Sequence, residues 1–148
     1  VNSLASVSAA TAVALSSDGL KMFVADLVGT LTVEEFALTS AFTISAHSRL
    51  GNFDPFGSNV VYGIDFSSDG KTMFLLDAGE AIRQYALVSA WSLDGASIFP
   101  AQSFGISSQI PTVTGGGLAV VDGGRRMYVA GVSAGSGGGT IVIFQYSL

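Results

Sequence analysis

Apolar residues along the chain fall in short alternating runs that are separated by polar turns. One such run, Val61 to Phe66, is followed by Ser67-Ser68-Asp69-Gly70, and a second run, Thr72 to Asp77, comes directly after it. An aspartate can accept hydrogen bonds from nearby backbone N–H groups, and glycine supplies the positive φ that tight turns require. Helical periodicity of the apolar positions is absent. The pattern therefore predicts short antiparallel strands joined by hairpin turns.

This sequence of strand, turn and strand occurs three times. All three methionines, Met22, Met73 and Met127, occupy the same position of the repeat, and their spacing gives offsets of 51 and 54 residues. Repeats of this length are typical of propeller blades and other stacked architectures. We expect one domain spanning residues 1–148, with repeat units at residues 8–54, 58–104 and 112–148.

Each full repeat is expected to contain four strands. In the first repeat they are predicted at residues 11–15, 21–26, 31–38 and within 41–54, and in the second at 61–66, 72–77, 81–87 and within 89–104. The third repeat is one strand short, with strands predicted at residues 117–121, 126–130 and 140–148. Because residues 1–7 precede the first repeat, we expect them to supply the missing outer strand of a blade in a ring-closing exchange. The predicted fold is all-β, with four-stranded antiparallel propeller blades.

The second repeat also resembles a known group of proteins. The run Phe66-Ser-Ser-Asp-Gly-Lys-Thr-Met-Phe, the following Asp77 and residues 83–91 are similar to the degenerate propeller repeats of bacterial and phage surface proteins. Those repeats are related to YncE-like and lactonase-like propellers. The resemblance covers nearly the whole chain and implies a scaffold that serves many functions. The third repeat departs from it, because Gly131 stands where the first two repeats have aspartate.

Composition indicates that the chain buries surface against a partner. Charged residues make up 11% of the sequence, compared with about 25% in average proteins, and the mean hydropathy is +0.55. Three blades are too few to close a ring, because propellers have about four to eight. We therefore expect a homodimer that forms one six-bladed ring. A trimer and an open half-ring docked on another protein are the alternatives.

Charge and residue counts argue against several classes of function. A net charge of −5 with six basic residues does not favour nucleic acid, which requires a basic surface. The longest uncharged run, residues 1–17, contains too many serines and alanines for a membrane span. Cysteine is absent and His47 is the single histidine, which argues against a zinc site and against a serine, histidine and aspartate triad. We predict no catalytic residue, no metal and no cofactor.

Four residues on the outer connections are candidate ligand-binding positions. Trp91 and Phe42 occupy equivalent positions of two repeats, where an aromatic ring could stack on a sugar or, alternatively, pack under the connecting loop. His47 and Arg49 lie together in the outer segment of the first repeat, where they could contact a ligand.

The acidic residues form no evident catalytic set. Glu34 and Glu35 are adjacent on a predicted strand, so their side chains face opposite ways, and we expect a solvated surface there. The lactonase resemblance implies an axial metal held by acidic and amide side chains. Asp65 is the clearest candidate for such a position.

The sequence thus favours a non-catalytic structural or adhesive module of a bacterial or phage surface, located outside the cell or on a virion. Its expected partners are a second copy of itself and a carbohydrate or a surface protein. Because this role depends on resemblance, a lactonase-like metal-dependent hydrolase remains the main alternative. A scaffold subunit without a soluble ligand is the third possibility.

Overall fold

The computed structural model of the chain describes Val7 and residues 9–26, 32–55, 60–109, 116–133 and 140–147. Regular structure in these residues is β throughout, apart from one 3-10 turn at Asp122–Gly124. None of the helical structure described is long and apolar enough to cross a membrane. The strands form three antiparallel sheets, which confirms the predicted all-β class.

The strands are ordered in each sheet as they are in the chain. The first sheet contains β1 (Ala10–Leu15), β2 (Lys21–Asp26), β3 (Thr32–Ser40) and β4 (Thr43–Phe53). The second contains β5 (Val61–Phe66), β6 (Thr72–Asp77), β7 (Ala81–Ala86) and β8 (Gln102–Gly105). The third contains β9 (Gly117–Val121), β10 (Arg126–Ser133) and β11 (Thr140–Ser147).

The third sheet has three strands among the described residues, one fewer than a full blade. The expected exchange strand, residues 1–7, lies outside the described residues except for Val7. That residue packs against buried side chains of the first sheet, among them Met22 and Phe36. In the second sheet, β8 occupies only the end of the window predicted for a fourth strand. The residues between β7 and β8 form a long connection instead, and part of it lies against the first sheet.

The turns of the first two repeats have the same hydrogen bonds. The Ser16 hydroxyl donates to Asp18 Oδ1 (2.6 Å), which also accepts the Leu20 N–H (3.0 Å). Ser67 and Asp69 repeat this arrangement. The glycine that follows each aspartate has a φ of +69°, which a side chain would strain. The predicted turn chemistry is confirmed in both repeats.

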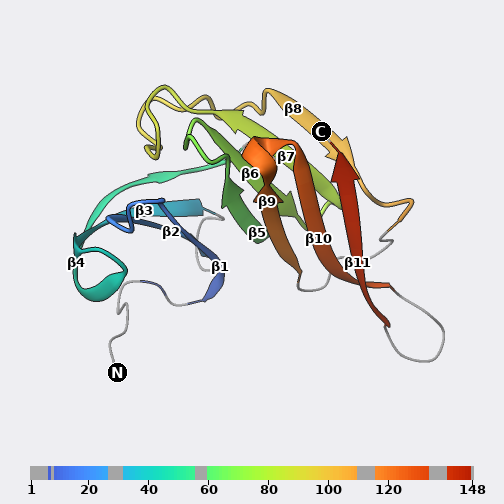
Figure 1. Ribbon diagram of the computed structural model, residues 1–148, viewed down its shortest axis with the longest axis horizontal. Coiled ribbons are helices and arrows are strands. Elements are labelled where there is room, and N and C mark those ends of the chain that lie inside the picture. Colours follow the sequence, from blue (N-terminus) through green and yellow to red (C-terminus); the bar gives the residue numbers. More distant parts are fainter. Residues whose placement is uncertain are drawn as a thin grey trace.

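The three sheets lie side by side in an open arc, with β1, β5 and β9 as neighbouring strands (Figure 1). The Thr11 hydroxyl donates to the Val61 carbonyl and joins β1 to β5. Asp65 Oδ2 accepts the Val120 N–H (2.6 Å) and joins β5 to β9. The strands approach so closely that a Cβ at Gly63 would lie 2.7 Å from that of Leu118. Crowding explains why small residues recur on these strands.

Apolar clusters fill the two boundaries between sheets. The first boundary includes Phe23, Phe53 and Tyr85, with the Phe53 and Tyr85 rings in an edge contact at 5.0 Å. The methionines of the second and third repeats point toward the sheet that precedes their own in the chain. Met73 packs toward the first sheet and Met127 toward the second, and both are buried. The repeated methionine position is therefore part of the packing between sheets.

Candidate functional site

The free face of the third sheet carries apolar residues that the other sheets bury. Ile143 pairs with Ala130 across the third sheet. The residues that pair at the same place in the second and first sheets are Ile82 with Leu76 and Val33 with Ala25. Val33, Ile82 and Ile143 therefore occupy equivalent positions. Val33 and Ile82 are both 0% exposed, because the next sheet covers them, whereas Ile143 is 71% exposed. We call the surface around Ile143, which includes Val121, Tyr128 and Ala119, the trailing face.

The first sheet is open at the opposite end of the arc. Val13 and Leu15 on β1 are 61% and 40% exposed, while the equivalent Ile64 and Phe66 on β5 are 4% exposed beneath the first sheet. We call the surface formed by Val13 and Leu15 the leading face. Both ends of the arc therefore present apolar positions that the repeat buries elsewhere.

The remainder of this side of the first sheet is covered by the chain itself. Val7 and Ile44 pack against a buried group that includes Met22 and Phe36. The His47 ring contacts the Phe36 ring edge-on at 5.8 Å, and His47 Nδ1 lies 3.1 Å from the Ile44 carbonyl oxygen. The apolar side chains of β2 and β3 on this side are thus buried, whereas Val13 and Leu15 on β1 are exposed.

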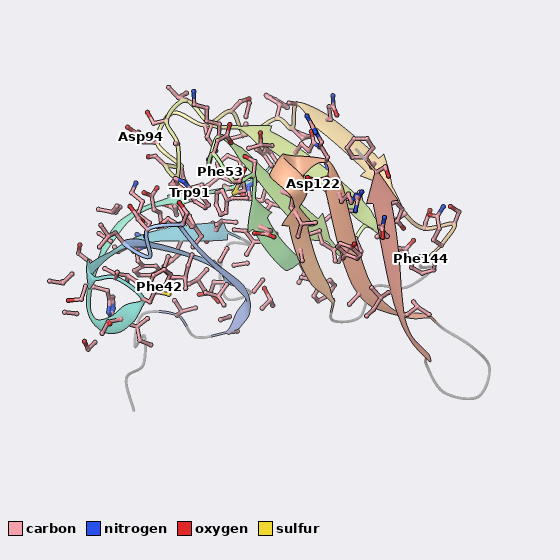
Figure 2. All side chains as sticks on the ribbon, viewed as in Figure 1. Phe42, Phe53, Trp91, Asp94, Asp122 and Phe144 are labelled. Atoms are coloured by element: carbon pink, nitrogen blue, oxygen red, sulfur yellow. The ribbon has the colours of Figure 1, made fainter. Side chains whose placement is uncertain are left out.

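A cleft of about 530 Å³ lies at the boundary of the first and second sheets. One wall is formed by residues 50–53 of β4 and by Asp54 directly after it, together with Lys21 of β2 and Glu35 of β3. The other wall is formed by residues 92–96 and Ile98 of the connection between β7 and β8. Figure 2 shows this connection, with Asp94 on it, beside the region of Phe53.

An ion pair lies against this cleft. Glu35 Oε1 is 2.6 Å from Lys21 Nζ, and Glu35 Oε2 accepts the Leu93 N–H at 2.8 Å. The Glu35 side chain is buried, whereas the Lys21 side chain is partly exposed. The expectation of a solvated surface at Glu35 was wrong, because the connection of the second sheet folds over this side chain. Neither Lys21 nor Glu35 was among the site residues expected from the sequence.

The signal that could have found this pair is a break in the repeat. Glu35 stands where the other repeats have Gln84 and Gln145, and Lys21 stands where the second has Thr72. Glu34 faces the opposite way, as predicted, and its Oε1 is 3.1 Å from Arg49 Nη2.

Trp91 and Phe42 hold equivalent structural contacts. The backbone N–H of Trp91 donates to the Gly70 carbonyl, and the backbone N–H of Phe42 donates to the Gly19 carbonyl, each at 2.8 Å. Each ring lies over the glycine to which its backbone is bonded. The Trp91 ring also contacts Phe66 at 5.1 Å. Trp91 is partly buried among these contacts, whereas Phe42 contacts its glycine and remains 63% exposed.

The four candidate ligand residues are not gathered around the cleft. None of Trp91, Phe42, His47 or Arg49 belongs to its lining. His47 and Arg49 lie on β4, where they pair across the strands with Leu38 and Phe36. A ligand role for these four residues remains untested.

Asp65, the candidate for an axial metal position, is engaged by the backbone. Its Oδ1 accepts the Phe66 N–H at 2.8 Å and its Oδ2 accepts the Val120 N–H at 2.6 Å. Within the described ranges, no three histidine, cysteine, aspartate or glutamate side chains lie close enough to hold a metal ion.

Comparisons with known proteins support the fold alone. No protein-family model matches the sequence, and no curated protein is similar to it in sequence. Among solved structures, the chain is similar to a putative 6-phosphogluconolactonase from Bacteroides uniformis, with a TM-score of 0.60 and 12% identity over 94% of this chain and 41% of that one. It is also similar to Hsv2 from Kluyveromyces lactis, with a TM-score of 0.52 and 9% identity over 93% of this chain and 47% of that one. The chain has a propeller-like fold and spans less than half the length of these structures.

Proposed function

We propose that the chain is a non-catalytic half of a β-propeller, which pairs with a second copy to form one six-bladed ring. The observation that carries this proposal is the 71% exposure of Ile143, compared with 0% for its equivalents Val33 and Ile82. Each chain contributes three sheets, so two chains supply six. Propellers commonly have about four to eight blades.

The partner is a second copy because the two ends of the arc match the surfaces that already pair inside the chain. At the internal boundaries, the side bearing Val33 or Ile82 receives the inner strand of the next sheet. In the proposed dimer, the trailing face of one copy receives the leading face of the other, so that Ile143 meets Val13 and Leu15. Because a two-fold axis relates the copies, both junctions form at once and no apolar end is left over.

The proposal also assigns residues 1–7 to the edge of β11, where they would add the fourth strand of the third sheet. An unpaired edge strand is prone to unwanted pairing, and this addition would remove it. The same exchange would release the side of the first sheet on which Val7 packs.

The proposed role of the ring is structural or adhesive, at a bacterial or phage surface, with a carbohydrate or a protein as ligand. A binding role is favoured over hydrolysis by the state of Asp65. Both of its oxygens accept backbone N–H groups, which leaves this carboxylate poorly suited to hold an axial metal. The lactonase-like alternative therefore lacks its best candidate ligand.

Size-exclusion chromatography with light scattering tests the assembly. We expect twice the chain mass of 15.1 kDa for the wild-type protein. The substitution Ile143→Glu places a charge in the proposed junction, where an unpaired buried charge is strongly unfavourable, and should give the monomer mass. Val88→Glu is the matched control, because Val88 is also exposed but lies on neither end face.

A monomer at every concentration of the wild-type chain would contradict the dimer. A trimer mass would contradict the six-bladed ring. An Ile143→Glu protein that stays dimeric would show that the copies associate through another surface.

A further inference from the structure

We propose that the cleft between the first and second sheets binds a neutral sugar, with Lys21, held by Glu35, as its central hydrogen-bond donor. This inference depends on the binding role proposed above but not on the dimer. It names a site that none of the four sequence candidates lines.

The ion pair between Lys21 and Glu35 is not required by the repeat. Burying a carboxylate is costly even when it is paired, and neutral residues of similar size often serve as well or better. The second repeat has the neutral combination Thr72 and Gln84 at the equivalent positions. A glutamine at position 35 could still accept the Leu93 N–H through its amide oxygen. Because the charges are not needed for packing, a role in binding explains them.

The ion pair holds the Lys21 ammonium group at the cleft. Glu35 has one oxygen on Lys21 and the other on the Leu93 N–H, so both are committed. Lys21 has three N–H donors and only one is used in this pair. Its side chain is 30% exposed and it lines the cleft. The pair therefore offers a fixed ammonium group to a ligand.

The walls of the cleft combine polar groups with aliphatic surface. Ser92, Asn52, Asp54 and Asp94 supply hydroxyl, amide and carboxylate groups, which together can donate and accept several hydrogen bonds. Leu50 and Ile98 add exposed aliphatic surface to the same cleft, and both are about half exposed. Sugars combine many hydroxyl groups with apolar C–H surface, which fits this lining. The volume of about 530 Å³ also lies in the range of ligand sites.

The charged side chains that line the cleft have a net negative charge. The lining contains three carboxylates, Glu35, Asp54 and Asp94, and one ammonium group, that of Lys21. An anionic ligand would enter a site of net negative charge and is disfavoured. We therefore assign a neutral sugar rather than a phosphate or an acidic sugar.

Amide NMR spectra of the full chain test the assignment. The probes are the methyl glycosides of glucose, galactose and N-acetylglucosamine, each titrated to its solubility limit, with inorganic phosphate and sialic acid as anionic counterparts. At least one neutral glycoside should shift the amide signals of residues 50–54 and 92–96, and the anions should not.

The decisive variant combines Lys21→Thr with Glu35→Gln, which installs the residues of the second repeat. Because it removes both charges together, no buried charge is left unpaired, and the melting temperature should stay close to that of the wild type. The affinity for the glycoside should fall about tenfold or more, as expected when a hydrogen bond from a charged donor is lost. Lys71→Thr is the control and should leave the affinity unchanged, because Lys71 is an exposed lysine outside the cleft lining.

Three results would overturn the assignment. They are the absence of shifts with all three glycosides, an affinity that the double variant does not lower, and binding of phosphate or sialic acid in place of the glycosides. A protein that dimerises but binds no glycoside contradicts only the cleft assignment. A monomer that binds a glycoside contradicts only the ring.

Discussion

The boundary between the second and third sheets and the trailing face of the third sheet have equivalent residues in opposite environments. Ile82 is covered by the third sheet and is 0% exposed, whereas Ile143 has no sheet over it and is 71% exposed. The same contrast separates Ile64 from Val13 at the leading face. Each repeat thus has the apolar residues for a neighbour on both sides, whether or not the chain provides that neighbour.

The exposure of these apolar residues therefore depends on whether a neighbouring sheet covers them, and the local sequence does not determine it. Exposed apolar residues are common singly, but a patch at a repeated junction position indicates a missing partner.

The largest effect is expected for a matched pair of substitutions. Ile82→Ala should lower the free energy of unfolding by about 2–5 kcal/mol, because it leaves a cavity in a filled boundary. Ile143→Ala should change it by less than about 0.5 kcal/mol under monomeric conditions, since little burial is lost. Urea denaturation at low protein concentration measures both. Similar losses in the two variants would mean that Ile143 is already covered within the monomer.

The next effect concerns the turn of the second repeat. A Cβ at Gly70 would lie 2.2 Å from the Trp91 indole nitrogen, and the residue has a φ of +69°. Gly70→Ala should therefore destabilise the protein by about 1–3 kcal/mol through backbone strain and displacement of the ring.

Gly95→Ala is the control for this turn. Gly95 has the same φ of +69°, but a Cβ at this position would lie 3.5 Å from its nearest neighbour, the Cγ2 of Val88. The difference between the two melting temperatures isolates the contact with Trp91. Equal losses would mean that the indole moves away without cost.

A smaller effect, of opposite sign, is expected at Tyr85. Its hydroxyl is buried and has no hydrogen-bond partner among the described residues, and burial raises the pKa of Tyr85 to about 12. The first repeat has Phe36 at the equivalent position. Tyr85→Phe should raise the free energy of unfolding by about 1 kcal/mol, because an unpaired buried hydroxyl is removed. A loss of stability in thermal denaturation would show that the hydroxyl is hydrogen-bonded in solution.

The smallest effect is a dependence on acid pH. Hydrogen bonds from Ser16 and from the Leu20 N–H lower the pKa of Asp18, and those from Ser67 and Lys71 do the same for Asp69, below the ordinary 3.8. A lowered pKa in the folded state contributes stability above the unfolded value, and this contribution is lost as the pH falls through the folded value. Stability should therefore decline below a pH of about 4.

The double variant Asp18→Asn and Asp69→Asn should weaken this decline, because an amide cannot titrate. Melting temperatures at a series of acid pH values measure it. An unchanged pH profile would assign the decline to other carboxylates.

The local structure followed from the sequence because it depends on neighbouring residues. Alternating apolar runs gave the strands, and the Ser-Ser-Asp-Gly turns gave the hairpins. The three methionines aligned the repeats with one another. A threefold repeat with a positive φ at each turn glycine leaves little other choice for the backbone.

The candidate site could not be predicted in the same way, because it depends on contacts between distant residues. Glu35 became a buried ion-pair partner only because a connection 58 residues further along the chain closes over it. Trp91 lies on a turn glycine and against Phe66 because its connection folds back, and no local pattern indicates this contact.

By itself, the sequence determined three similar sheets and the residues with which each meets a neighbour, since hydrophobic alternation and turn chemistry act over a few positions. Tertiary structure alone decided which of these faces are covered, because the answer depends on which sheets lie next to each other. It also decided where the polar residues of the cleft converge, since they come from strands and a connection far apart in the chain.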